Sequence, residues 1–131
     1  MLMEILNKIK IIDLALYCEN CLILSDIHIG FEESLSRQGV LVPRLQFEEM
    51  ASRLQKIFGL IGSDENFSKI IINGDLKHDF GTISEQEWRN VLKFIDLCAK
   101  NCNELIIIQG NHDAVLNSIS KKRNIHLVQH Y

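Results

Sequence analysis

Side chains of metal-binding type follow three short apolar runs of this 131-residue sequence. Ser25–Gly30 contributes Asp26 and His28, Asn73–Asp75 contributes one carboxylate, and Gln109–Asp113 contributes an amide, an imidazole and another carboxylate. A mixture of carboxylate and imidazole ligands suits Mn²⁺, Fe or Zn²⁺ better than Ca²⁺, which prefers oxygen ligands alone. The pattern therefore predicts a metal centre assembled from three separate segments of the chain.

The three apolar runs are typical of strands that are buried on both faces. Each run is short, rich in Leu or Ile, and apolar without alternation, namely Cys21–Leu24, Ile70–Ile72 and Leu105–Ile108. Because the carboxyl ends of parallel strands meet along one edge of a sheet, the polar residues that follow them share a crevice. That crevice would gather Asp26, His28, Asp75, Asn111 and His112.

Two helices are expected between these strands. Apolar residues recur at helical spacing over residues 43–58 and again over residues 84–101. Ser84 and Glu87 have the spacing of a capping box, which marks the start of the second helix. The order strand, helix, strand, helix, strand predicts an α/β fold with a largely parallel sheet and flanking helices.

Two further strands are expected in addition to these three. Residues 15–17 would pair with the first run through a turn at Glu19 and Asn20, and residues 124–131 would form a fourth strand. The length suits one domain, so residues 1–131 are expected to form a single unit.

The composition is that of an ordinary globular protein, with 47 % apolar and 24 % charged residues. The 14 basic and 17 acidic residues give a net charge of −3, so a polyanion would need a local basic patch or a bound metal. No apolar run approaches the roughly 20 residues of a membrane span. The first ten residues do not resemble a signal peptide. A cytoplasmic location and no membrane partner are therefore expected.

The polar motifs resemble a known family of enzymes. Asp26-x-His28, Gly74-Asp75 and Gly110–Asp113 are similar to the first three motifs of calcineurin-like metallophosphoesterases. The resemblance covers about residues 15–113 and implies the N-terminal half of that family's αββα sandwich. The stretches that flank these motifs resemble archaeal-type phosphoesterases, which are related to the nuclease subunit of double-strand-break repair complexes; they are Asp26–Glu32, Gly39–Arg44 and Gly74–Gly81.

The resemblance implies a role for each metal ligand. Asp26 and His28 would bind the first of two divalent ions, Asp75 would bridge both, and Asn111 would bind the second. Mn²⁺ is the expected metal, with Fe, Zn²⁺ or Ni²⁺ as alternatives. A hydroxide between two such ions would attack phosphorus in line, as in other two-metal sites.

The resemblance also implies how the substrate is handled. His112 would face the phosphate as general acid or charge stabiliser, and Asp113 would orient its ring. His78 would touch the substrate phosphate, although a solvated loop histidine is the alternative. The expected substrate is a phosphomonoester or phosphodiester, with DNA or a nucleotide as candidates.

One departure from the family pattern concerns the remaining metal ligands. The family continues with another histidine and then a Gly-His-x-His motif, whereas His126 and His130 have no such setting. The chain is therefore expected to be a C-terminally truncated domain that is poorly active alone. It would self-associate or bind a complementary C-terminal half. The alternative is a non-catalytic subunit or binding module that keeps the fold and a residual metal site.

The four cysteines allow a second type of metal site. Cys18 and Cys21 have the C-x-x-C spacing of a zinc ligand pair, but no second such pair accompanies them. Cys98 and Cys102 are expected on the apolar face of the second helix, where buried thiols act as small hydrophobic groups. The buried-thiol interpretation is favoured over a four-cysteine zinc site.

Overall fold

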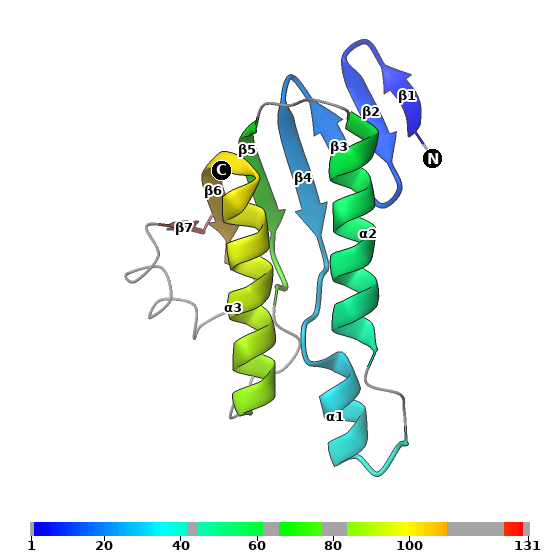
Figure 1. Ribbon diagram of the computed structural model, residues 1–131, viewed down its shortest axis with the longest axis vertical. Coiled ribbons are helices and arrows are strands. Elements are labelled where there is room, and N and C mark those ends of the chain that lie inside the picture. Colours follow the sequence, from blue (N-terminus) through cyan, green and yellow to red (C-terminus); the bar gives the residue numbers. More distant parts are fainter. Residues whose placement is uncertain (1, 42–44, 62–65, 77–83, 110–124, 130–131) are drawn as a thin grey trace.

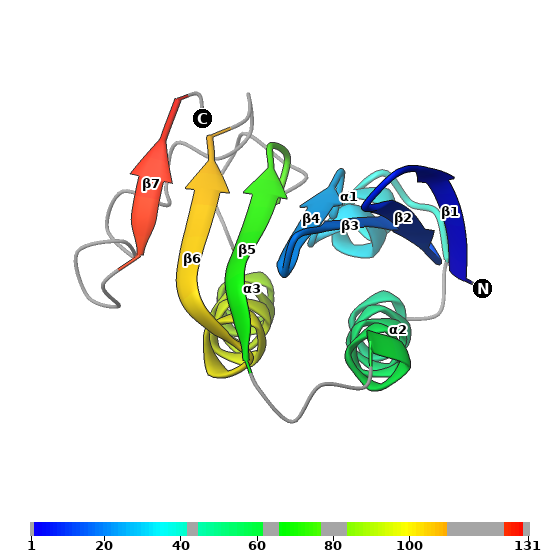
Figure 2. The same ribbon diagram turned by 90° about the horizontal axis from the view of Figure 1, so that it is seen from above.

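A seven-stranded mixed sheet forms the centre of the computed structural model, which describes residues 2–41, 45–61, 66–76, 84–109 and 125–129. The strands lie in sequential order in the sheet (Figures 1 and 2). Strands β1 to β4 pair antiparallel, and β4 to β7 pair parallel. The strands are β1 (Leu2–Leu6), β2 (Ile9–Ile12), β3 (Ala15–Cys18), β4 (Cys21–Ser25), β5 (Phe67–Asn73), β6 (Cys102–Ile108) and β7 (His126–Val128).

The α/β fold and the three buried parallel strands are confirmed. The three apolar runs form β4, β5 and β6, and Ile71 pairs with Ile23 on one side and Ile106 on the other. The two further predicted strands are β3 and β7, and β3 lies inside the sheet between β2 and β4. Glu19 and Asn20 form the β3–β4 turn with φ values of 47° and 64°, in the left-handed region that such tight turns use.

The first two strands of the sheet were not expected. Strands β1 and β2 form a hairpin that extends the sheet through β3, so half of the strand pairs are antiparallel. Lys8 and Asp13 lie in the turns of this region with φ values of 70° and 53°. Neither Asn7-Lys8 nor Asp13-Leu14 contains glycine, which would have marked a hairpin more clearly.

Within the described ranges, three helices accompany the sheet: α1 (Phe31–Arg37), α2 (Gln46–Ile61) and α3 (Glu85–Lys100). Ser84 caps α3, and its Oγ accepts a hydrogen bond from the Glu87 N–H at 3.1 Å, as the capping-box spacing predicted. The expected place of Cys102 was wrong. Because α3 ends at Lys100, Cys102 opens β6 instead and lies buried opposite Phe67.

Helices α2 and α3 cover one face of the sheet (Figure 2). Leu22, Ile70 and Ile72 are fully buried on this face. Leu54 and Ile57 of α2, with Val91, Phe94, Ile95 and Cys98 of α3, belong to the same core cluster. Burial of this apolar area is the main stabilising contribution to the fold. The packing also fixes the positions of the strand ends.

The opposite face carries an in-register apolar row that crosses six strands. Ile71 and Ile106 at its β5–β6 end are 8 % and 1 % exposed, whereas Leu16 on β3 and Met3 on β1 are 39 % and 46 % exposed. Apolar surface therefore remains accessible over β1 to β3. The row consists of Met3, Ile11, Leu16, Ile23, Ile71 and Ile106.

Among the described residues, no helix combines the length and the apolar character that a membrane crossing requires. The cytoplasmic location stays a prediction.

Candidate metal centre

Three of the predicted metal ligands come together where β4 and β5 end. One ligand atom from each of Asp26, His28 and Asp75 lies within 4.8 Å of the other two. The Nε2 atom of His28 is 4.0 Å from Oδ1 of Asp26. Strand register explains this proximity, because Ser25 pairs with Asn73 in parallel and both segments continue from the same edge.

Main-chain hydrogen bonds continue the pairing beyond the two strands. The N–H of His28 donates to the Asp75 carbonyl oxygen at 2.8 Å, and the N–H of Ile29 donates to the Leu76 carbonyl oxygen at 2.8 Å. Ile29 and Leu76 are also buried in the core. The separation of His28 and Asp75 is therefore set by the backbone and by apolar anchors, and it does not depend on the side chains alone.

The three candidate ligands share an uncommon backbone conformation. Asp26, His28 and Asp75 have φ values of 52°, 50° and 47°, in the left-handed region that residues with a Cβ seldom adopt. The other described non-glycine residues with positive φ lie in the hairpin turns between β1 and β4. Such conformations persist where the surroundings enforce them, and they concentrate at functional sites.

Gly30 closes this loop and begins α1. Its φ of 96° is left-handed, and a Cβ at this position would lie 2.6 Å from Cδ of Glu87. Glu87 is only 2 % exposed, so its side chain cannot turn out into solvent without leaving a buried position. A glycine is therefore required here for both its conformation and its size, and it allows α3 to approach the ligand loop.

The oxygen atoms of the two carboxylates have different surroundings. Oδ1 of Asp75 is buried, and no donor among the described residues forms a hydrogen bond to it. Oδ2 of Asp26 is 3.0 Å from the Ser25 hydroxyl, which also lies 3.2 Å from the Asn73 carbonyl oxygen. A buried carboxylate oxygen without a donor is costly, and a cation relieves that cost. The donor set of two carboxylates and one imidazole fits a divalent transition metal.

Gln46 and Glu32 support the ligand loop, and neither was predicted to have a role in the site. The Gln46 side-chain amide donates to the His28 carbonyl oxygen at 3.1 Å. Oε1 of Glu32 accepts from the N–H groups of Gln46 at 2.6 Å and Leu45 at 3.1 Å. These contacts join residues more than ten positions apart, so no local pattern signals them.

The remaining predicted site residues lie outside the described part of the chain. They are His78, Asn111, His112 and Asp113. Their proposed roles stay predictions. The last described residues before Asn111 lie beside the end of β5, because the Gly74 N–H donates to the Ile108 carbonyl oxygen at 3.0 Å.

The cysteines do not form a comparable group. Among the residues that the structure describes, the metal-ligating side chains found close together are those of Asp26, His28 and Asp75. This group contains no cysteine. Burial raises the pKa of the Cys98 and Cys102 thiols, which disfavours the thiolate that zinc binds. The buried-thiol interpretation is therefore favoured for this pair.

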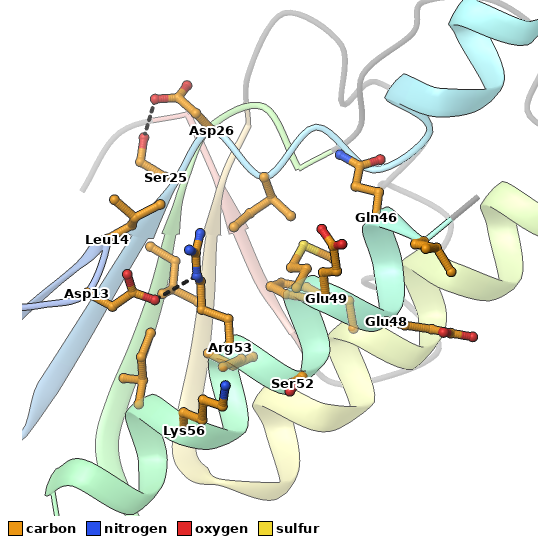
Figure 3. A pocket seen from close by; sticks show the side chains of 17 residues that line it. Asp13, Leu14, Ser25, Asp26, Gln46, Glu48, Glu49, Ser52, Arg53 and Lys56 are labelled. Atoms are coloured by element: carbon orange, nitrogen blue, oxygen red, sulfur yellow. Dashed lines mark hydrogen bonds and ion pairs between the residues drawn. The ribbon is translucent and has the colours of Figure 1, made fainter. Parts of the chain in front are cut away.

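A pocket of about 860 Å³ lies beside the metal group, between α2 and the β2–β3 turn (Figure 3). Its volume is in the range of small-molecule sites. Nε of Arg53 and Oδ2 of Asp13 form an ion pair at 2.7 Å within it, while Asp26 and Ser25 lie at its edge. The lining has no excess of basic groups, so it gives a phosphate little attraction without a cation. Its charged residues are Asp13, Asp26, Glu48, Glu49, Arg53 and Lys56.

Comparisons with known proteins agree with this geometry. The family model of calcineurin-like phosphoesterases matches residues 20–130. Among solved structures, the chain is similar to the nuclease MPE of Pseudomonas putida, with a TM-score of 0.59 and 23 % identity. The match covers 92 % of this chain and 53 % of the nuclease chain, so this chain spans about half the length of that relative. No curated protein matches the sequence.

Proposed function

Because this chain belongs to the calcineurin-like phosphoesterase family, we propose that it provides a metal centre for the hydrolysis of a phosphoester. One observation carries the proposal, namely that ligand atoms of Asp26, His28 and Asp75 lie within 4.8 Å of one another. The buried Oδ1 atom of Asp75, to which no described residue donates a hydrogen bond, supports it independently, since a cation would satisfy that atom.

Each of the three residues would have a separate role in binding the metals. Asp26 and His28 would hold the first divalent ion, and Asp75 would reach both ions from the end of β5. Mn²⁺ is the metal that we propose, because imidazole and carboxylate donors together suit it. When bound, a pair of such ions polarises the phosphoryl oxygens and neutralises their charge.

The residues after β6 would complete the reaction. Asn111 would bind the second ion, His112 would give a proton to the leaving oxygen, and Asp113 would orient the imidazole. His78 would contact the phosphate. The end of β6 supports these roles, because it lies close to the candidate ligand Asp75. The carbonyl oxygen of Ile108 accepts a hydrogen bond from the N–H of Gly74, which directly precedes Asp75.

The proposed substrate is a phosphomonoester or phosphodiester, with DNA or a nucleotide as the candidates. The family supports the phosphoester, and the nuclease of the same fold directs attention to nucleic acid. The net charge of −3 and the mixed charges near the pocket leave the metal as the main source of attraction for a phosphate. A non-catalytic subunit that keeps the metal group is the alternative.

We also propose that residues 1–131 form the N-terminal part of a single domain, whose exposed sheet face packs against more protein. The apolar row from Met3 to Ile106 supports this, because its β1–β3 end is accessible to solvent. A complementary C-terminal half or a second copy of the chain would cover it, and the chain alone would hydrolyse substrate poorly.

Calorimetric titration with Mn²⁺ tests the metal centre. Asp75→Asn should weaken binding by about tenfold or more, since even the loss of a supporting contact costs that much at many metal sites. Asp96→Asn, an exposed aspartate on α3, is the matched control and should bind like the wild type. Equal binding by all three proteins would refute the role of Asp75.

A further inference from the structure

Gln46 connects the first turn of α2 to the loop that carries the candidate ligands. Its Nε2 atom donates to the carbonyl oxygen of His28 at 3.1 Å in a partly buried position. Figure 3 shows the Gln46 amide directed from the start of α2 toward the loop that follows Asp26. The contact therefore joins a helix end to a ligand residue through the ligand's main chain.

Both main-chain polar atoms of His28 are engaged. Its N–H donates to Asp75, and its carbonyl oxygen accepts from Gln46 and from the Phe31 N–H at 3.2 Å. These bonds act on the two peptide units that flank a left-handed Cα with φ of 50°. Since that conformation costs free energy in a residue with a Cβ, bonds on both sides are what hold it.

Gln46 is itself fixed by a carboxylate from the neighbouring helix. Oε1 of Glu32 in α1 accepts from the N–H groups of Leu45 and Gln46. A negative charge is favourable at a helix N-terminus, where main-chain N–H groups lack partners within the helix. Gln46 thus connects the ligand loop to α1. Its side-chain amide bonds to the His28 carbonyl oxygen, and its main-chain N–H bonds to the Glu32 carboxylate.

We propose that Gln46 is a positioning residue of the metal centre, which holds His28 in its metal-binding conformation through the His28 carbonyl oxygen. This inference rests on the proposed function, because it assumes that His28 is a ligand. In this role Gln46 acts on the metal site through the main chain of His28 and is not itself a ligand. Its effect on metal affinity arises because the free protein already has the backbone conformation that binding needs.

The test compares two glutamines in the first turns of equally long helices. Gln46→Met keeps the approximate length and helix propensity of the side chain but removes the donor. Gln86→Met is the matched control in α3, where the glutamine amide donates to the Asn90 side chain on the exposed surface. Gln46→Met should weaken Mn²⁺ binding about fivefold, the equivalent of one typical hydrogen bond, and Gln86→Met should leave it unchanged.

A second measurement uses the metal-free protein. Loss of the Gln46 bond should speed hydrogen exchange of the His28 amide about fivefold in EDTA, with no matching change in the exchange of core β5 amides. Gln46→Ala serves here if Gln46→Met folds poorly, because alanine is the best helix former. Unchanged His28 exchange in the folded variant would overturn the proposal.

The outcomes separate this inference from the proposed function. If the wild type binds Mn²⁺ at this group and Gln46→Met binds it equally well, the positioning role is wrong and the metal centre stands. If the wild type does not bind Mn²⁺ at this group, both fail together. Equal weakening by Gln46→Met and Gln86→Met would also contradict the inference, since it would reflect a general loss of stability.

Discussion

The main-chain N–H of His28 donates to the carbonyl oxygen of Asp75 at 2.8 Å, so two candidate metal ligands from different strands are joined through their backbones. The bond forms because β4 and β5 are parallel neighbours in register up to Ser25 and Asn73. The sheet therefore brings the imidazole and the carboxylate together before any metal is bound. Such preorganisation reduces the conformational entropy that binding must overcome.

Asp75→Asn should stabilise the metal-free protein. Oδ1 of Asp75 is buried with no donor from the described residues, and asparagine removes the charge while tolerating the left-handed φ of 47°. We expect the free energy of unfolding in EDTA to rise by about 1 kcal/mol. Urea denaturation measures this, with Asp96→Asn as control. A lower stability of Asp75→Asn in EDTA would contradict the account of that oxygen.

Three glycine-to-alanine variants should rank in a fixed order. Gly30→Ala combines a left-handed φ with crowding against buried Glu87 and should cost about 2 kcal/mol or more. Gly39→Ala has the left-handed φ but open space, so it should cost about 1 kcal/mol. Gly59→Ala lies within α2 with nothing near its Cβ and should stabilise by roughly 0.5–1 kcal/mol.

Thermal or urea unfolding of the three variants gives this ranking directly. A Gly30→Ala protein as stable as Gly39→Ala would show that Glu87 moves aside without cost.

Stability should fall at alkaline pH because of the buried thiols. Burial raises the pKa of Cys98 and Cys102 in the folded protein, whereas in the unfolded chain they ionise near their ordinary values. Above about pH 9 the unfolded state thus binds fewer protons, and stability declines by up to about 1.4 kcal/mol per pH unit for the fully buried Cys98 thiol. Below that range this contribution is fully present.

The Cys98→Ala variant separates this effect from other groups that titrate at high pH. Its unfolding free energy should decline less steeply between about pH 8.5 and 10 than that of the wild type. Identical slopes for the two proteins would mean that the Cys98 thiol is not held protonated by burial.

The exposed end of the apolar sheet row should promote association. Leu16 is 39 % exposed on this face, and its cross-strand partners Ile11 on β2 and Ile23 on β4 are apolar. We expect light scattering to show a mass that rises with concentration, and Leu16→Gln to reduce the rise. Leu60→Gln is the control, since Leu60 is an exposed leucine on α2. A monomer at every concentration would refute this expectation.

The central strands could be predicted because their signals are local. The runs at β4, β5 and β6 are apolar without alternation, and the capping residues of α3 are three positions apart. Asp26, His28 and Asp75 then follow as candidate ligands from their places after the strands. The sequence therefore contained enough information for the fold class and for this ligand group.

Other features depend on tertiary contacts that no short pattern reports. The Glu32 carboxylate and the Gln46 amide act across separate elements, and neither residue type is unusual at a helix surface. The prediction that Cys102 lies on the helix was wrong. The four-residue spacing between Cys98 and Cys102 is compatible with a helix face, but spacing alone does not show that α3 ends at Lys100. The β1–β2 hairpin was missed because its turn residue Lys8 is an uncommon choice for a left-handed position.

The most direct test of the central claim is the location of bound Mn²⁺ by paramagnetic broadening in amide NMR spectra. Our account predicts that substoichiometric Mn²⁺ broadens the amide resonances of residues 25–29 and 74–76 first, and that Asp75→Asn abolishes this selectivity. Broadening that begins at another acidic cluster, or that spreads evenly over the chain, would contradict a metal centre at Asp26, His28 and Asp75.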